Sequence, residues 1–262
     1  MLQLLSIGNS FSQDAHKWLK AVCDSLNFEV CLYNLFIGGC SLEQHWNNID
    51  HNAEQYVLEI NGEPQEKVCI TDIVKKQQWD IITLQQASHF SGLSQTYEPY
   101  LEKITANLKQ KQPQAKLYLH ETWAYEVNST HAGFANYQNN QEVMFRSLQS
   151  AYQIAAQAIG AKLIPVGDTV QYFRNHVCEF NYQNGGLSLN RDGFHLSYLY
   201  GRYLAACVWA EVLFGLNVEQ CPFVPKTETE TANKELIECI QKNVHCFLKG
   251  CKGVENKALQ QL

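Results

Sequence analysis

The residues of this sequence that best fit enzyme chemistry are one serine near the N-terminus and an aspartate–histidine pair in the last third. Ser10 follows an apolar segment (2–7) long enough for one strand, and apolar residues at helical spacing begin soon after it. Asp192 and His195 lie three residues apart, just before an apolar helical segment. That spacing lets a carboxylate hold one imidazole nitrogen while the other faces a hydroxyl, the arrangement that activates a nucleophilic serine.

Other interpretations of the Ser10 turn remain open from the sequence. A serine between a strand and a helix is commonly an N-cap. A phosphate loop is disfavoured because the turn has neither G-x-G-x-x-G nor G-K-[ST]. Ser12 and Cys40 are alternative nucleophiles, and we expect Cys40 to be structural because no histidine adjoins it in the sequence.

The segments 7–11 (IGNSF) and 192–197 (DGFHLS) resemble the first and last motifs of the SGNH (GDSL-like) hydrolase superfamily, and more narrowly its bacterial DUF4886 branch. The resemblance spans about residues 1–215. It implies a three-layer α/β/α sandwich with a mainly parallel five-stranded sheet of flavodoxin-like order. The alternation of strands and helices alone predicts only the α/β class.

The resemblance also implies the groups of an oxyanion hole. The segment 34–42 resembles the second motif of the superfamily, so Gly39, with Gly38 as second choice, is expected to donate its N–H beside that of Ser10. The third motif departs from the usual G-x-N-D, because LQQAS stands at 84–88. Gln86 is therefore expected to replace the missing asparagine, while Gln85 caps neighbouring backbone.

Composition is that of one enzyme domain. The chain has 262 residues, of which 45% are hydrophobic and 18% charged, enough for a full core. We expect a single domain over 1–262, with about 216–262 as a C-terminal helical extension. The net charge of −6, without a long basic run, argues against nucleic acid or a membrane as partner. No oligomeric state is predicted.

Cysteine usage and motif searches bear on the compartment and on cofactors. The ten cysteines include no C-x-x-C pair, and strand-like sequence begins at Leu2, so we expect reduced thiols in a cytoplasmic protein, or an exported one if a leader has been removed. His120 and Glu121 do not form H-E-x-x-H, so no metal is expected, nor any cofactor. No apolar stretch reaches the ~18–20 residues of a membrane span.

The remaining pattern predicts the elements that position these residues. A hairpin around Asn61-Gly62 is expected as a surface insertion near the site, and the polar tail after Gly250 as mobile. The loop from 120 to 140 is rich in aromatic residues, so Trp123 either stacks on substrate or only packs the loop; Phe194 is a second candidate for substrate contact. Further strands are predicted at 28–35, 80–84, 116–119 and 162–166, and helices at 99–112, 141–159, 168–174 and 228–248.

Together these residues predict a serine esterase. Ser10, His195 and Asp192 would remove a small acyl group, with acetyl expected first, from a small-molecule or carbohydrate ester. Two alternatives are a non-catalytic carbohydrate-binding module on the same fold, and a lipase or thioesterase of the same superfamily.

Overall fold

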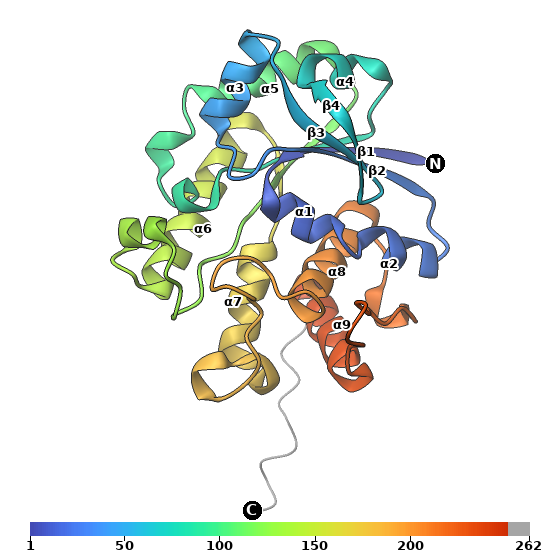
Figure 1. Ribbon diagram of the computed structural model, residues 1–262, viewed down its shortest axis with the longest axis vertical. Coiled ribbons are helices and arrows are strands. Elements are labelled where there is room, and N and C mark those ends of the chain that lie inside the picture. Colours follow the sequence, from blue (N-terminus) through green and yellow to red (C-terminus); the bar gives the residue numbers. More distant parts are fainter. Residues whose placement is uncertain (251–262) are drawn as a thin grey trace, which may run out of the picture.

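A seven-stranded sheet forms the centre of the computed structural model, which describes residues 1–250 (Figure 1). The strand order is β4-β3-β2-β1-β5-β6-β7. The strands are β1 (Leu2–Gly8), β2 (Val30–Phe36), β3 (Glu54–Ile60), β4 (Glu63–Cys69), β5 (Ile81–Leu84), β6 (Lys116–His120) and β7 (Lys162–Ile164). The strands β1, β2, β5, β6 and β7 are parallel, which confirms the predicted α/β class and its parallel core.

The hairpin predicted around Asn61-Gly62 is part of the sheet, so the expectation of a surface insertion and of five strands was wrong. Strand β3 pairs antiparallel with β2, with Asn34 opposite Glu59. The carboxylate of Glu59 is buried and accepts a hydrogen bond from Asn34 Nδ2 at 2.7 Å and one from Gln13 Nε2 at 2.5 Å. A buried carboxylate must be hydrogen-bonded, and these two bonds meet that need for Glu59. They also join the hairpin to the centre of the fold.

Helices cover both faces of the sheet. The helices α3, α4, α5 and α6 cover one face, and α1, α2 and α8 cover the other (Figure 1). The helices are α1 (Ser10–His16), α2 (Leu19–Ser25), α3 (Leu42–Asp50), α4 (Ile70–Lys76), α5 (Tyr100–Lys111), α6 (Gln141–Ile159), α7 (Val166–His176), α8 (Tyr200–Phe214) and α9 (Lys234–Lys249). This is the three-layer α/β/α arrangement that the resemblance implied.

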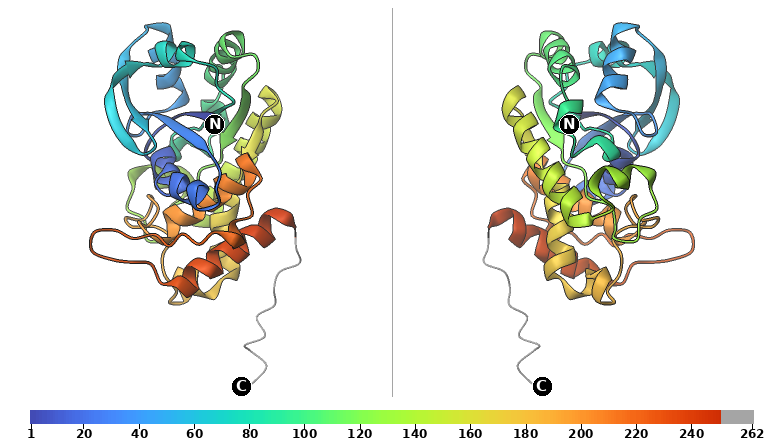
Figure 2. Two further views of the ribbon diagram at one scale, coloured as in Figure 1. Left: turned by 90° about the vertical axis from the view of Figure 1, so that its right-hand side faces the viewer. Right: turned by 90° about the vertical axis from the view of Figure 1, so that its left-hand side faces the viewer.

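The C-terminal helix α9 packs against α8, at the end of the molecule opposite the β3–β4 hairpin (Figure 2). Its apolar stripe, which includes Ile237, Ile240 and Val244, is buried there, as expected for an amphipathic helix. The prediction for the tail after Gly250 lies outside the described residues. Within residues 1–250, no helix is both long and apolar enough to cross a bilayer.

Candidate active site

The turn between β1 and α1 presents Ser10 at the carboxyl edge of the sheet. The N-cap of α1 is Asn9, whose Oδ1 accepts a hydrogen bond from the N–H of Phe11 at 3.0 Å, so the Ser10 hydroxyl is not used as a cap. The backbone of Asn9 is extended, with φ −136°. Gly8 leaves space for the turn, because a Cβ there would lie 2.5 Å from Ser12 Oγ.

A continuous line of hydrogen bonds connects the three residues singled out in the sequence. His195 Nε2 lies 2.9 Å from Ser10 Oγ, and His195 Nδ1 lies 2.7 Å from Asp192 Oδ2. These are the distances at which a histidine can accept a proton from a serine while a carboxylate fixes its tautomer. The structure thus brings Ser10, His195 and Asp192 together from the two ends of the chain.

The Asp192 carboxylate is held in its charged form by the loop that carries it. Partial burial works to raise its pKa, but hydrogen bonds from the His195 ring and from the N–H groups of His195 and Phe194 outweigh this effect. The net result is a pKa below the ordinary value of an aspartate. Asp192 is therefore ionised while it orients the His195 ring.

The glycine loop after β2 lies beside Ser10. Gly38 and Gly39 both line the same cleft as Ser10, and Asn9 Nδ2 donates to the carbonyl of Cys40 at 3.0 Å, which fixes the loop against the nucleophile turn. Gly39 has a φ of +65°, a conformation that favours glycine. Within residues 1–250, the N–H groups of Ser10 and Gly39 have no hydrogen-bond acceptor, so both can serve an oxyanion.

Gln86 does not lie where the sequence analysis expected it. Its Nε2 donates to the carbonyl and the hydroxyl of Thr96 at 3.0 and 3.1 Å, and its Oε1 accepts from the N–H groups of Leu42 and Ala87. The side chain joins three loops and turns its amide away from the serine. The expectation of Gln86 as an oxyanion donor is corrected on these contacts.

Gln85 is the glutamine nearer to the nucleophile turn. Its Nε2 donates to Asn9 Oδ1 at 2.6 Å, and its Oε1 lies 2.8 Å from Nδ1 of the buried His120. Side chains along a strand alternate between its two faces, so only one of the two glutamines was expected to point at Ser10. The choice between them depended on how the alternation continues past the end of the strand. Gln85 therefore fixes the Asn9 side chain through this hydrogen bond.

The two candidates for substrate contact are placed differently. Trp123 is fully buried; it stacks on Phe11 and donates its indole N–H to the carbonyl of Phe194 at 2.7 Å. Of the two roles left open for Trp123, it therefore has loop packing, and it is not a substrate-contact residue. Phe194 is half-buried and lines the cleft, so it stays a candidate for substrate contact.

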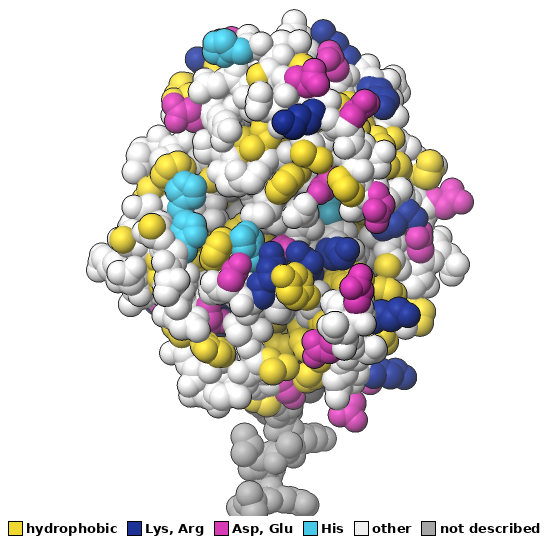
Figure 3. Space-filling model, in the orientation of Figure 1, with side chains coloured by type: hydrophobic (Ala, Val, Ile, Leu, Met, Phe, Trp, Pro, Cys, Tyr) yellow, Lys and Arg dark blue, Asp and Glu magenta, His cyan; other side chains and the backbone are white. Residues whose placement is uncertain are grey.

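A cleft of about 510 Å³ opens over the serine, within the usual size range of small-molecule sites. Histidine side chains gather on this side of the molecule beside lysines and arginines (Figure 3). Sequence reasoning missed His89 and gave His131 no role of its own, because neither belongs to a motif. The residues lining the cleft are Asn9, Ser10, Phe11, Gly38, Gly39, Ser88, His89, His131, Ala132, Gly133, Phe194 and His195.

The neighbouring nucleophile candidates are already engaged. The single hydroxyl proton of Ser12 is shared between two acceptors, the carbonyl of Asn9 at 2.8 Å and Asn34 Oδ1 at 2.9 Å. Cys40 does meet a histidine, His45, at 3.4 Å, but it is fully buried, and this burial raises the pKa of its thiol to about 12. Neither can supply an anion to a substrate.

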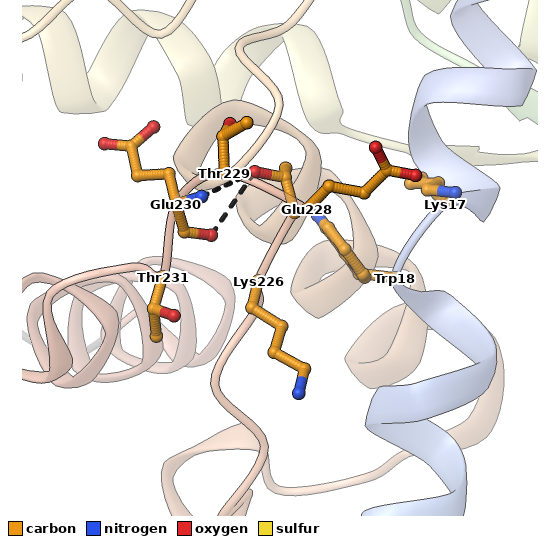
Figure 4. A pocket seen from close by; sticks show the side chains of 8 residues that line it. Lys17, Trp18, Lys226, Glu228, Thr229, Glu230 and Thr231 are labelled. Carbon is orange, nitrogen blue, oxygen red and sulfur yellow. Dashed lines mark hydrogen bonds between the residues drawn. The ribbon is translucent and has the colours of Figure 1, made fainter.

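A larger cavity elsewhere lacks catalytic groups. It measures about 830 Å³ and lies between the end of α1 and the loop 226–231, where Thr227 Oγ1 bonds the backbone of Glu230 (Figure 4). Its walls carry lysine, glutamate, threonine and one tryptophan, Trp18, but no serine or histidine. In the described part of the chain, no cluster of three or more His, Cys, Asp or Glu side chains could hold a metal.

Comparisons with known proteins identify the family of the chain. The model of the family DUF4886, a domain of unknown function, matches residues 3–240. A crystal structure of a DUF4886 family protein from Bacteroides uniformis is 35% identical, with 97% of this chain and 98% of that chain covered and a TM-score of 0.86. No curated protein matches the chain.

More distant solved structures share the fold. One is a putative SGNH hydrolase from Slackia heliotrinireducens, 23% identical, with 81% of this chain and 98% of that one covered and a TM-score of 0.55. Another is a variant of an acetyl-xylooligosaccharide esterase from Geobacillus stearmophilus, 9% identical, with 81% and 94% covered and a TM-score of 0.51. The chain belongs to the DUF4886 family, and it shares the fold of the SGNH hydrolases among these solved structures.

Proposed function

We propose that this protein is a serine esterase that removes a small acyl group, acetyl above all, from a carbohydrate alcohol. The observation that carries the proposal is the unbroken line of hydrogen bonds from Asp192 through His195 to Ser10 at the floor of an accessible cleft. A binding pocket has no use for that sequence of carboxylate, imidazole and hydroxyl. The acetyl-xylooligosaccharide esterase among the structural neighbours supports the choice of substrate class.

In the first half of the reaction, Ser10 Oγ forms a bond to the acyl carbon while its proton passes to His195 Nε2. The N–H groups of Ser10 and Gly39 stabilise the negative oxygen of the tetrahedral intermediate. The bond between the acyl carbon and the leaving oxygen then breaks, and His195 returns the proton to the alcohol.

In the second half, water attacks the acyl-enzyme. His195 accepts the proton of the water, and the bond between the acyl carbon and Ser10 Oγ breaks as the proton returns to the serine. The products are a carboxylic acid and the restored hydroxyl. Asp192 keeps the imidazole oriented throughout and stabilises its positive charge, without taking up a proton itself.

The cleft favours a short acyl chain over a fatty one. A lipase presents an apolar approach to its site, whereas none of the exposed large apolar side chains of residues 1–250 lines this cleft. They are scattered over the surface at Met1, Val127, Ile154, Tyr182, Leu187 and Tyr198. The lining combines Phe11, Ala132 and Phe194 with polar side chains such as Ser88, His89 and His131, which can hydrogen-bond a sugar leaving group.

Hydrolysis of acetylated sugars and of p-nitrophenyl esters with rising chain length tests the proposal. We expect turnover of acetyl esters that falls as the chain lengthens, and its loss in Ser10→Ala with an unchanged melting temperature. Binding of acetylated sugars without any turnover would establish the rival binding module. A preference for long chains would establish the lipase, and Ser12→Ala serves as the matched control for a serine that does not react.

A further inference from the structure

Outside the three catalytic side chains, the most densely bonded charged group near the site is Asp14. It lies four residues after Ser10 on α1, which places both side chains on the same face of the helix about one turn apart. The carboxylate is 1% exposed. The reaction steps above do not use it.

Asp14 binds the loop that carries the other two catalytic residues. Its Oδ2 accepts the N–H of Leu196 at 2.8 Å, directly after His195. Both carboxylate oxygens accept from Arg191 Nη1, at 3.1 and 3.2 Å, directly before Asp192. The carboxylate thus holds the segment 191–196 at both of its ends.

The loop is closed on itself around the same contacts. Arg191 donates its backbone N–H to the carbonyl of His195 at 3.0 Å and its Nη1 to the carbonyl of Leu196. Asp14 Oδ1 also accepts from Nε of Arg202 on α8 at 2.7 Å. One buried carboxylate therefore joins the helix of the nucleophile, the loop of Asp192 and His195, and helix α8.

We infer that Asp14 is a positioning residue that sets the contact between Ser10 and His195. The inference rests on the proposed function, because it concerns the same reaction. Two catalytic groups that come from segments about 180 residues apart need a fixed link, and a displacement of about 1 Å costs on the order of 10²-fold in rate. Asp14 provides that link one helical turn from the serine.

The test compares Asp14→Asn with Glu211→Gln. Glu211 is a second buried carboxylate, on α8, that accepts from His245 Nδ1 and from the N–H of Val218 away from the cleft. Both variants remove one buried charge, so they control for lost stability. On p-nitrophenyl acetate we expect Asp14→Asn to lower kcat about 10²-fold with little change in KM, and Glu211→Gln to leave both unchanged in the folded fraction.

A double-mutant cycle separates positioning from general damage. If Asp14 acts through His195, Asp14→Asn has no further effect in the His195→Ala background. An equal loss in both backgrounds, or a loss no larger than that of Glu211→Gln, overturns the inference. Should Asp14→Asn not fold, Arg202→Gln removes one partner of the same carboxylate and is measured in the same cycle, with the same outcomes counting for and against.

A readout that needs no turnover keeps this inference distinct from the proposed function. The proton between His195 Nδ1 and Asp192 is followed by NMR at low field, whether or not any ester is hydrolysed. We expect this resonance to broaden or vanish in Asp14→Asn and to stay in Glu211→Gln. If it stays sharp in Asp14→Asn, the loop does not depend on Asp14. A wild-type protein that has the resonance but no esterase activity counts against the proposed function alone.

Discussion

Asn9 Nδ2 donates a hydrogen bond of 3.0 Å to the carbonyl of Cys40, and this bond links the turn of the nucleophile to the loop of Gly39. The two backbone N–H groups proposed for the oxyanion lie on either side of it. Asn9→Asp keeps the Oδ1 acceptor for Phe11 but places a carboxylate oxygen against a carbonyl. We expect kcat to fall by up to about 10²–10³-fold, as for loss of one oxyanion donor, with KM nearly unchanged.

Steady-state kinetics of Asn9→Asp with p-nitrophenyl acetate check this expectation. Asn61→Asp is a suitable control, because that asparagine lies in the β3–β4 turn, away from the cleft. A rise in KM without a change in kcat would mean that the Gly39 loop binds ground-state substrate instead.

The Asp192–His195 pair predicts unequal losses. His195→Ala removes the general base and should leave only the catalysis due to binding and the oxyanion hole. Asp192→Asn presents an amide N–H toward Nδ1, which favours the tautomer with its proton on Nε2, unable to accept from Ser10; we expect a drop of up to about 10⁴-fold in kcat. Single-turnover rates measure both, and mild, equal losses would contradict a triad.

Gln86 is now predicted to act on stability. Gln86→Ala leaves the N–H groups of Leu42 and Ala87 without their acceptor in a buried place, a loss of about 1–3 kcal/mol. We expect a lower free energy of unfolding by denaturant titration and a nearly normal kcat per folded molecule. A fall of 10²-fold or more in kcat with unchanged stability would return Gln86 to the oxyanion hole.

Local pattern predicted more of this molecule than long-range pairing did. The helix expected at 141–159 has those bounds, since its apolar stripe and Gly160 cap are local signals. The single helical period expected after Ser10 is instead two helices, α1 and α2, interrupted at Lys17 and Trp18. A hairpin at Asn61-Gly62 was predictable, but its pairing with β2 depends on a partner strand about 25 residues away.

The same contrast between local pattern and long-range contacts applies to the site. Ser10, Asp192 and His195 were found because motifs mark them, and the structure brings them into contact. Asp14 carries no motif, and its arginine and backbone partners lie about 180 residues further along the chain. From its type, Trp123 could stack on substrate or pack the loop equally well, and only tertiary packing decides for the loop.

His131 is expected to contribute to sugar recognition. Its Nδ1 accepts the N–H of Gly133 at 3.0 Å, so the neutral ring carries its proton on Nε2. Burial, and next the nearby His195, lower the pKa of His131 although Asp192 opposes them, so the ring is neutral near pH 7. His131→Phe should keep the edge contact with Phe194 and lose both the Nε2 donor and the Nδ1 acceptor of the Gly133 N–H.

The expected result for His131→Phe is a KM for acetylated sugars about 3–10-fold higher, the value of one hydrogen bond, with p-nitrophenyl acetate unaffected. Parallel assays with the two substrates measure this. Equal changes for both substrates would place His131 in the catalytic step and not in recognition of the leaving group.

Glu121 gives a prediction about stability and pH. The side chain is fully buried after β6; its Oε2 accepts the N–H of Asp168 at 2.9 Å, and its Oε1 has no partner within residues 1–250. Burial, and next the charge of Asp168, raise its pKa well above the ordinary value, against the opposing effect of that hydrogen bond. In the folded chain Glu121 therefore keeps a proton that it releases in the unfolded chain at a pKa of about 4.3, give or take half a unit.

The sign of the effect follows from linkage. Because the folded state binds the extra proton, this contribution to the free energy of unfolding is complete below about pH 4.3 and is lost as pH rises toward the folded-state pKa. Glu121→Gln removes the titrating group and keeps the side-chain size. Denaturant titrations at pH 5 and pH 8 should show a smaller fall in stability for Glu121→Gln than for the wild type, whereas the exposed Glu142→Gln should keep the full fall. An identical fall in all three proteins would mean that Glu121 is ionised in the fold.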